Sequence, residues 1–547
     1  MTFEKAYLFS LTKFKLSDAR LIDQITKMGF DVEDNNASEI SVDITPNRPD
    51  LLDIYGFARA LRYFMHRSKR FDYKVESNVP ALSLSVGQNV KAIRPFISSF
   101  VAEGKGITEN ELKYLVNFSE KLGSIYGRNR KRLAMGLHDF SKIKPPVSYD
   151  AFSDLTFIPL NESREMRFSD VLKENEKGIS YSHTIRNVEG KTFYPALVDA
   201  EGVMSFIPII NSNRTKLSTG AKSIFVDITG TSQYIIEKAA DLFASVFIDL
   251  GYTISPVEVK YKSKAVMYPQ MSSTTITIPA SRIEENIGVR IGPNNIVSLA
   301  NKMGYKAAIV GSNIRFVTPP YRLDIFNEQD VIEDIAIGYG YDYIQPEPIP
   351  SVQQGSLEDV TRLTGMLSKL MLGLGFSEMM NSYLTSEETN FDKMLIKHDS
   401  DYVKIKFSKE KQLNMLRNWI LPQLIYNASL SQHEKLPQKT FELDMVFSLA
   451  GGKTLEEYHL AALIVDAKAN FNEIKGIVEA LLSTVGLQYS IKEDKMGSFI
   501  AGRQAGIYVG NKKVGFFGEI HPQVLSNFGL EEPATAFEIN ISQAFQQ

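Results

Sequence analysis

The segment TPPYRLDIFNEQDVIEDIAIGYGYDYI, residues 318–344, carries the clearest fold signal in the chain. Asn327 is a favourable N-cap, and the acidic residues that follow it suit the positive end of a helix dipole. We therefore expect a helix to begin here. Asp330, Glu333 and Asp334 lie at positions i, i+3 and i+4, so they share one face of that helix.

The same segment is strongly acidic, because residues 321–347 contain seven carboxylates and one arginine. One interpretation is an acidic first turn and a solvated helix face. The other is a Mg²⁺ site, because a hard cation prefers clustered carboxylate oxygens. In that case Asp324 would join the three helical acids. The spacing alone leaves both interpretations open.

Residues 269–345, which contain this segment, form one candidate domain. Ser281–Glu284 match a capping box that would begin a first helix, and Pro293 marks the start of a second. The residues Gly311-Ser312-Asn313 lie between two strand-like runs and predict a hairpin. Two helices followed by a hairpin are typical of a winged-helix-like, or helix-turn-helix, unit.

The rest of the chain divides around this domain into three further candidate domains. Residues 1–85 predict a small mixed unit, and residues 86–268 an α+β domain with recurring strands and two helices. A proline-rich linker at 345–355 leads into residues 346–547, which predict an antiparallel sheet with helices on it. The expected fold class is therefore α+β with several domains.

Composition excludes several classes of protein. The chain has 547 residues, a formal net charge of −3 and no cysteine. Such a charge does not fit a uniformly basic nucleic-acid binder, and the missing thiols exclude disulfides and cysteine-ligated metals. No apolar run approaches the ~18 residues of a membrane span, and the N-terminus lacks a secretory pattern. We expect a cytoplasmic protein with no membrane association.

Two further segments are candidates for function. Residues 128–144 contain six Lys or Arg and one Asp, which predicts either a solvated basic turn or a patch that contacts phosphate. Asp227, Thr229 and Thr231 alternate along one predicted strand and share a face of it. Such residues cap strand ends, or they line a hydrolytic pocket where a carboxylate orients water. Composition does not separate these alternatives.

An ordered set of motifs points to one family. In chain order they are PNRPDLL with GFARAL, RNRKRLAMGLHD, PIINS with FVDITGT, TPPYRLDI with DVIEDIAIGYGYDYI, KTFEL, FNEIKG and GEIHPQVLSNFGL. With these motifs the chain resembles, over nearly its whole length, the beta subunit of phenylalanyl-tRNA synthetase of the archaeal and eukaryotic type.

The resemblance implies an (αβ)₂ heterotetramer that joins phenylalanine to tRNA(Phe) with ATP as substrate and Mg²⁺ as cofactor. The adenylate-forming site would lie on the alpha subunit. Residues 346–547 would form a class II synthetase-like module that is catalytically inert. Four acids match the family's metal-binding pattern position by position, namely Asp324, Asp330, Glu333 and Asp334.

The resemblance also implies that residues 86–268 form an editing domain, which hydrolyses tyrosine mischarged onto tRNA(Phe). A pocket for phenylalanine rejects an added hydroxyl only about 10²-fold, so a second sieve improves accuracy. Asp227 and Thr229 would border the editing pocket. Asn211, Ser205 and His138 are further candidates because they lie near the matching motifs.

Two other functions remain as alternatives. The chain could be a stand-alone tRNA-editing hydrolase that carries inert folds. It could also be a non-catalytic scaffold or binding module that uses residues 269–345 on nucleic acid. The acidic segment 321–347 would repel phosphates at short range, which disfavours the latter.

Overall fold

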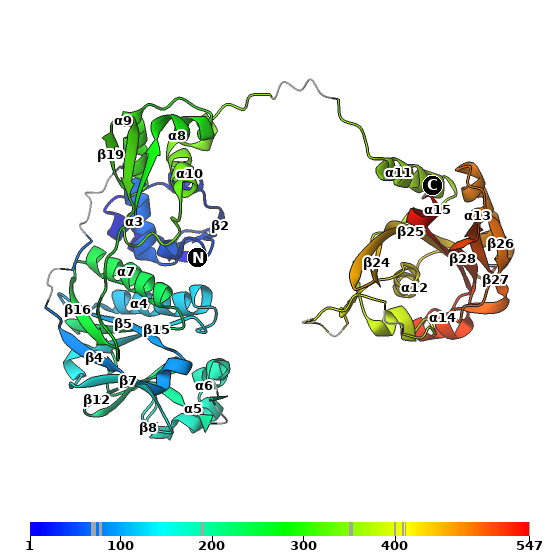
Figure 1. Cartoon of the computed structure of the whole chain (residues 1–547). Coiled ribbons are helices and arrows are strands. Elements are labelled where there is room, and N and C mark those ends of the chain that lie inside the picture. The colour runs from blue at the N-terminus through cyan, green and yellow to red at the C-terminus, as the bar shows by residue number, and fades with distance from the viewer. Residues whose placement is uncertain are drawn as a thin grey trace. The chain divides into compact units, whose positions relative to one another are not determined.

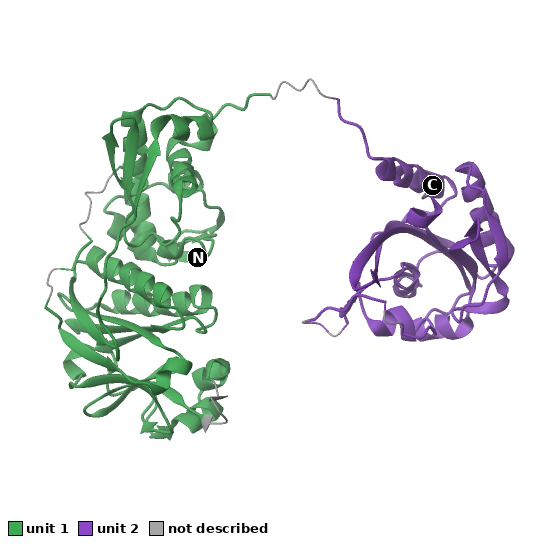
Figure 2. Cartoon of the chain, viewed as in Figure 1, with its two compact units in different colours: residues 1–348 green, residues 349–547 purple. Residues whose placement is uncertain are grey.

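The protein is described from a computed structural model, which covers the chain except residues 67–72, 76–78, 186, 189–190, 349–353, 399–400, 407, 409, 411 and 546–547. The chain divides into two compact units, residues 1–348 and 349–547 (Figure 2). Part of the predicted linker at 345–355 lies outside the described residues. None of the described helices is long and apolar enough to cross a membrane.

The first unit begins with a small three-stranded sheet of order β1-β3-β2. Its elements are β1 (Thr2–Glu4), α1 (Lys5–Thr12), α2 (Asp18–Lys27), β2 (Val32–Asn35), β3 (Glu39–Val42) and α3 (Ile54–Phe64). Asp53 is the N-cap of helix α3, and its carboxylate accepts hydrogen bonds from the N–H groups of Tyr55 and Gly56. Apolar residues of α3 share a core with the helices of the next sheet.

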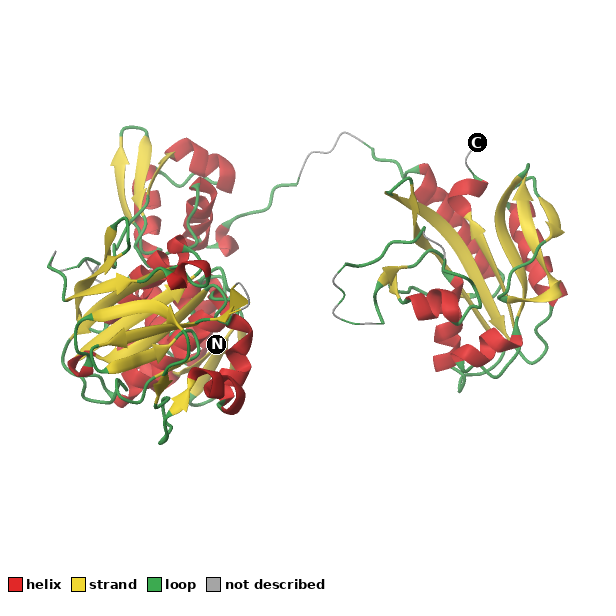
Figure 3. Ribbon diagram, turned by 60° about the horizontal axis from the view of Figure 1, so that its bottom comes forward, coloured by secondary structure: helices red, strands yellow, loops and turns green. Residues whose placement is uncertain are grey.

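A ten-stranded sheet dominates the first unit (Figure 3). Its path is β14-β13-β12-β7-β4-β16-β5-β15-β6, and β17 pairs with β16. The strands are β4 (Leu82–Val86), β5 (Phe96–Glu103), β6 (Leu133–Asp139), β7 (Val147–Phe152), β12 (Tyr194–Asp199), β13 (Gly202–Phe206), β14 (Ile210–Asn211), β15 (Ser223–Gly230), β16 (Thr253–Lys260) and β17 (Ala265–Tyr268).

Helices α4 (Glu109–Lys121) and α7 (Gln233–Asp249) lie side by side along one face of this sheet (Figure 1). Their contact includes Phe118 and Phe243, whose rings stack at 5.4 Å. Short elements extend the other end of the sheet, namely β8 (Thr156–Phe157), β9 (Met166–Arg167), α5 (Phe168–Glu174), α6 (Glu176–Tyr181), β10 (Asn187–Val188) and β11 (Lys191–Thr192).

The last part of the first unit has the predicted order of two helices and a hairpin. Its elements are β18 (Thr275–Pro279), α8 (Ala280–Ile287), α9 (Pro293–Lys302), β19 (Lys306–Val310), β20 (Asn313–Val317) and α10 (Glu328–Tyr339). The predicted Ser281–Glu284 capping box is wrong. Pro279, the last residue of β18, holds the N-cap position, and the Glu284 carboxylate instead accepts hydrogen bonds from Ile291 and Gly292 N–H.

The predicted helix start at Asn327 is confirmed. The Asn327 side chain accepts a hydrogen bond from Gln329 N–H, and Asp330 Oδ2 accepts from Asn327 N–H at 2.9 Å, which completes a capping box. The hairpin is confirmed as well, since Val310 pairs with Asn313 across Gly311 and Ser312.

The second unit is a seven-stranded sheet of order β21-β24-β25-β29-β28-β27-β26. Its strands are β21 (Ser377–Glu378), β24 (Gln438–Ala450), β25 (Lys453–Val465), β26 (Ser490–Glu493), β27 (Phe499–Val509), β28 (Lys512–Ile520) and β29 (Ala534–Asn540), and β22 (Leu384–Thr385) pairs with β23 (Met415–Leu416) outside it. Every pair within this sheet is antiparallel except β21 with β24.

Helices cover both faces of the second sheet. Helices α11 (Asp359–Gly373), α13 (Phe471–Thr484) and α15 (Ile541–Ala544) pack on one face, and α12 (Leu421–Leu430) and α14 (Pro522–Phe528) pack on the other. The fold is therefore a mixed α/β architecture with several sheets. The expected boundary between residues 85 and 86 falls inside β4, which belongs to the ten-stranded sheet.

Candidate functional site

A pocket of about 260 Å³ opens beside the ten-stranded sheet. Its wall includes four of the five side chains predicted for the editing site, namely Asp227, Thr229, Asn211 and Ser205. Apolar residues from α4 and from the segment after β13 form much of the rest, including Leu112, Val116, Ile207 and Ile209. Small-molecule pockets span ~300–1,000 Å³, so this one suits a group the size of an amino acid.

Strand register explains why the polar groups meet. On β15 and β6, Asp227 pairs with Gly136 and Thr229 pairs with Ala134, so these side chains face the same side of the sheet. Gly136 leaves space at this point. A Cβ at position 136 would lie 2.2 Å from Asp227 Oδ2 and 3.1 Å from Asn211 Oδ1. The pocket therefore depends on a glycine opposite the carboxylate.

His138 supports Asp227 from behind the pocket. It is fully buried, and its Nε2 lies 3.0 Å from Asp227 Oδ2. Its Nδ1 lies 2.8 Å from Thr215 Oγ1. The imidazole therefore joins Asp227 to Thr215 in a buried chain of polar groups, so His138 is placed as a positioning residue.

The other predicted residues are also held by hydrogen bonds. Ser205 donates to Asn211 Oδ1 at 2.9 Å, because the two residues pair across β13 and β14. Thr229 Oγ1 accepts a hydrogen bond from Arg94 Nε at 2.9 Å. Burial lowers the pKa of Arg94 to about 10. Thr231, by contrast, does not line the pocket.

The basic segment 128–144 has two roles in the structure. Arg130 is buried and donates to the carbonyl oxygens of Pro208 and Ile209, and it also pairs with Glu120 at the pocket wall. Four other basic residues of the segment are exposed: Arg128, Lys131, Arg132 and Lys144. The phosphate-contact prediction therefore rests on these four and excludes Arg130.

Sequence reasoning missed Gly136, Thr215, Arg94 and Arg130. Each supports the pocket through a partner far away in sequence; Arg94 and Thr229, for example, are 135 residues apart. The motif RNRKRLAMGLHD contained two of them, but only the strand register shows which residue faces Asp227.

The four acids of the predicted metal site lie along a groove of about 690 Å³ in the first unit. Arg322 donates to both oxygens of Asp324, at 2.9 and 2.7 Å, and lies 2.7 Å from Asp334 Oδ2. Burial acts to raise the pKa of Asp324, but the Arg322 guanidinium outweighs it, so this pKa lies below its ordinary value. Tyr305 O–H also donates to Asp334.

This arrangement does not fit a metal ion as it stands. Arg322 already neutralises Asp324 and Asp334, and one oxygen of Asp330 caps α10 by accepting from the N–H groups of Phe326 and Asn327. Within the described parts of the chain, no group of three or more His, Asp or Glu is placed to hold a metal. The assignment of Mg²⁺ to these four acids stays a prediction.

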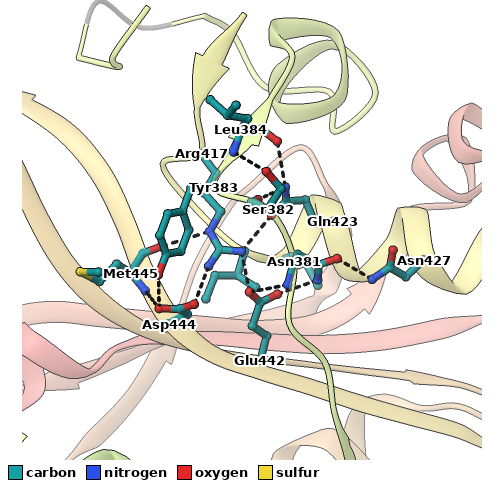
Figure 4. Close-up of polar contacts among 12 residues, drawn as sticks. Asn381, Ser382, Tyr383, Leu384, Arg417, Gln423, Asn427, Glu442, Asp444 and Met445 are labelled. Atoms are coloured by element: carbon teal, nitrogen blue, oxygen red, sulfur yellow. Dashed lines mark hydrogen bonds and ion pairs between the residues drawn. The ribbon is translucent and has the colours of Figure 1, made fainter. Parts of the chain in front are cut away.

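A third polar cluster lies inside the second unit (Figure 4). Arg417 is fully buried, and its Nη1 donates to Glu442 Oε1 at 2.6 Å and to Gln423 Oε1 at 2.9 Å. Its Nε donates to the Met445 carbonyl oxygen at 3.1 Å. Asn381 binds the other oxygen of Glu442. Arg417 Nη2 has no hydrogen-bond partner among the described residues, and its ion-pair neighbour Asp444 Oδ2 lies 3.8 Å away. The arginine is nevertheless fully buried, so it is not exposed to a ligand.

Two family models match the chain. The model described as phenylalanyl tRNA synthetase beta chain CLM domain matches residues 346–541. The model described as tRNA synthetase B5 domain matches residues 276–341, which contain the two helices and the hairpin. The matches fall in both compact units.

Curated relatives match over nearly the whole chain. The phenylalanine–tRNA ligase beta subunit of Archaeoglobus fulgidus is 34% identical over 96% of this chain and 95% of its own length. That of Thermococcus sibiricus is 37% identical over 90% of this chain and 88% of its own length.

A solved structure matches part of the chain. It is an N-terminal fragment of the phenylalanyl-tRNA synthetase beta subunit from Pyrococcus horikoshii, with a TM-score of 0.59 and 30% identity. The match covers 62% of this chain and 99% of that fragment. The predicted resemblance is thereby confirmed, and the chain belongs to the phenylalanine–tRNA ligase beta subunit family.

Proposed function

We propose that the chain, together with an alpha subunit, attaches phenylalanine to tRNA(Phe) in an (αβ)₂ heterotetramer in the cytoplasm. ATP is the substrate that activates phenylalanine, and Mg²⁺ accompanies it, as is general for this ligase family. The observation that carries the proposal is the match to beta subunits over nearly the whole chain.

The adenylate-forming site belongs to the alpha subunit in this proposal. The buried Arg417 cluster supports this division, because the guanidinium is fully buried and its Nη1 is already bound by Glu442 and Gln423, so its charge is not exposed to a nucleotide. Residues 346–547 are thus a class II synthetase-like module without its chemistry. Residues 269–345 form the winged-helix-like unit, and β4 belongs with the editing-type domain rather than with residues 1–85.

The second activity is hydrolysis of tyrosine mischarged onto tRNA(Phe). The pocket that gathers Asp227, Thr229, Asn211 and Ser205 supports it, because a carboxylate among neutral polar groups can orient water beside an apolar slot. Asp227 accepts a proton as the water oxygen bonds to the ester carbonyl carbon. The bond from that carbon to the ribose oxygen then breaks, and the ribose oxygen takes up a proton.

The test uses the chain alone and mixed with its alpha subunit. We expect Phe-tRNA(Phe) formation only with the mixture, and Tyr-tRNA(Phe) hydrolysis by the complex without ATP. Pyrophosphate exchange by the lone chain would refute the division of labour. Full hydrolysis by the lone chain, with no complex on a sizing column, would instead identify a stand-alone hydrolase.

A further inference from the structure

Arg130 joins three segments of the first unit that meet beside the pocket. Its Nη1 donates to the carbonyl oxygens of Pro208 and Ile209, at 2.9 and 2.8 Å, in the connection between β13 and β14. Its Nη2 donates to Glu120 on α4, and its guanidinium lies 3.9 Å from the centre of the Tyr181 ring on α6. The Arg130 side chain is only 10% exposed. These contacts are therefore made with little water present, where a charged donor contributes most.

The backbone that carries Arg130 is strained. Arg128, Asn129 and Arg130 have φ values of 51°, 51° and 60°, so three consecutive residues other than glycine adopt the left-handed conformation. Such residues cost of order 1–3 kcal/mol each and persist only where surrounding contacts fix them. Arg94 supplies such contacts, because its Nη1 donates to the Arg130 carbonyl oxygen at 2.9 Å while its Nε and Nη2 bind Thr229. The turn is thereby tied to β15, on the opposite side of Arg130 from residues 208 and 209 in the chain of contacts.

The connection that Arg130 holds forms much of the apolar wall of the pocket. Residues 207–210 all line the pocket, and they lead directly into Asn211. Connections between strands are ordinarily more mobile than the strands themselves, and a shift of about 1 Å in a binding site is enough to weaken its fit. A planar guanidinium that binds two successive carbonyl oxygens fixes both the position and the orientation of this segment.

Glu120 connects Arg130 to α6 at the rim of the pocket. Its Oε1 accepts a hydrogen bond from Lys177 Nζ at 2.7 Å, and all three residues line the pocket. Burial acts to raise the pKa of Glu120, but Arg130 and Lys177 outweigh it, so this pKa lies below its ordinary value. Glu120 is therefore ionised at neutral pH. The charge of Arg130 is balanced within the chain rather than left for a phosphate of tRNA.

We propose that Arg130 is a positioning residue of the pocket, which sets the affinity for the aromatic amino-acid side chain of a mischarged tRNA by holding residues 207–210 in place. The inference rests on the proposed hydrolysis of Tyr-tRNA(Phe). Arg130 acts through residues 207–210, and Asp227 keeps its role beside the water. Because an apolar wall binds the substrate equally before and during the chemical step, loosening it raises KM and leaves kcat nearly unchanged.

The test measures steady-state hydrolysis of Tyr-tRNA(Phe) by the whole complex. Arg130→Lys keeps a positive charge but loses the planar group that reaches two carbonyl oxygens and a carboxylate. We expect its KM to rise by about tenfold, with kcat within about twofold of the unsubstituted value. Glu120→Gln keeps an acceptor for Arg130 and removes only the charge, so its KM should rise by roughly threefold. Because the Glu120 side chain is 36% exposed, this second variant should keep the fold.

Two measurements separate positioning from other roles. Arg59→Lys is the matched control, because Arg59 is a buried arginine of the same unit that pairs with Asp249 and does not line the pocket. It should lower the stability of the first unit, as measured by calorimetry, without changing KM. The affinity for uncharged tRNA(Phe) should stay constant in all three variants, since the proposed wall contacts only the attached amino acid.

Each other outcome contradicts a different statement. Unchanged KM in Arg130→Lys and Glu120→Gln would refute the positioning role and leave the proposed function intact, and Glu120→Gln decides alone if Arg130→Lys does not fold. No hydrolysis by the unsubstituted complex would refute the proposed function itself. An equal rise in KM for Arg59→Lys would attribute the effect to general loosening of the unit. Weaker, salt-dependent binding of uncharged tRNA would instead make Arg130 a phosphate contact.

Discussion

The pocket around Asp227 and the cluster around Arg417 are built from similar groups but differ in whether space remains beside the carboxylate for a ligand. Both contain a carboxylate, a buried cation or imidazole, and an asparagine. In the pocket, Gly136 leaves space beside Asp227 Oδ2. In the cluster, Arg417 donates to Glu442, Gln423 and Met445 and is fully buried. Chemical function therefore depends on unfilled space as much as on residue type.

The largest expected effect separates the two regions by activity. Asp227→Asn keeps the side-chain volume but removes the proton acceptor, so Tyr-tRNA(Phe) hydrolysis by the complex should fall by about 10²–10⁴-fold. Aminoacylation should be unchanged. The control is Asp444→Asn, which alters a carboxylate beside Arg417 and should leave hydrolysis unchanged. Equal hydrolysis by Asp227→Asn and the unsubstituted complex would contradict the site.

The second-largest expected effect is on stability, and it concerns the Arg417 cluster rather than the Asp227 pocket. Arg417→Met leaves Glu442 buried without its cation, which should cost about 3–5 kcal/mol of the free energy of unfolding of the second unit. Trp419 is the only tryptophan in the chain and is buried in this unit, so its fluorescence reports that transition during denaturant titration.

The matched control replaces both partners. Arg417→Met with Glu442→Leu removes the charge pair together, and most of the lost stability should return. Hydrolysis of Tyr-tRNA(Phe) should stay constant in both variants. A double variant as unstable as the single one would show that the cluster's hydrogen bonds, rather than the uncompensated carboxylate, dominate.

A third substitution tests whether the pocket needs the open space that Gly136 leaves beside Asp227. Gly136→Ala places a methyl group 2.2 Å from Asp227 Oδ2, so the carboxylate must move and hydrolysis should fall by roughly tenfold. Overpacking should also cost about 1–3 kcal/mol of stability. Gly476→Ala is the control, because that glycine lies in α13 with nothing within 4 Å of an added Cβ. It should stabilise the helix by up to about 1 kcal/mol, as measured by the Trp419 transition.

The sequence predicted the parts of each region that depend on local pattern. Asp227 and Thr229 were found because they alternate on one strand, and Asn327 because it caps the helix that follows it. The Arg417–Glu442 pair was missed because its members are 25 residues apart and meet only when the sheet forms. The capping box at Ser281 failed for a related reason, since β18 ends at Pro279 and the helix starts directly after it.

The smallest expected effect is on the rate of hydrolysis, and it comes from Thr215, which contacts His138 behind the pocket. Thr215→Val removes the oxygen 2.8 Å from His138 Nδ1 and leaves that nitrogen without its partner in a fully buried position. His138 should then hold Asp227 less well, and kcat for hydrolysis should fall by roughly threefold to tenfold, the worth of about one hydrogen bond. KM should stay constant, because Thr215 does not line the pocket.

Two controls separate this positioning role from general packing. Thr215→Ser keeps the hydroxyl and should restore most of the rate. Thr535→Val makes the same change in the second unit, where the buried Thr535 Oγ1 has no hydrogen-bond partner among the described residues, and should leave stability unchanged or raise it. If Thr215→Ser were as slow as Thr215→Val, the methyl packing rather than the hydroxyl would position His138. The same Thr→Val substitution breaks a hydrogen bond at Thr215 and removes an unpaired hydroxyl at Thr535. Comparing the two variants therefore shows how much a buried hydroxyl contributes when it has a hydrogen-bond partner and when it has none.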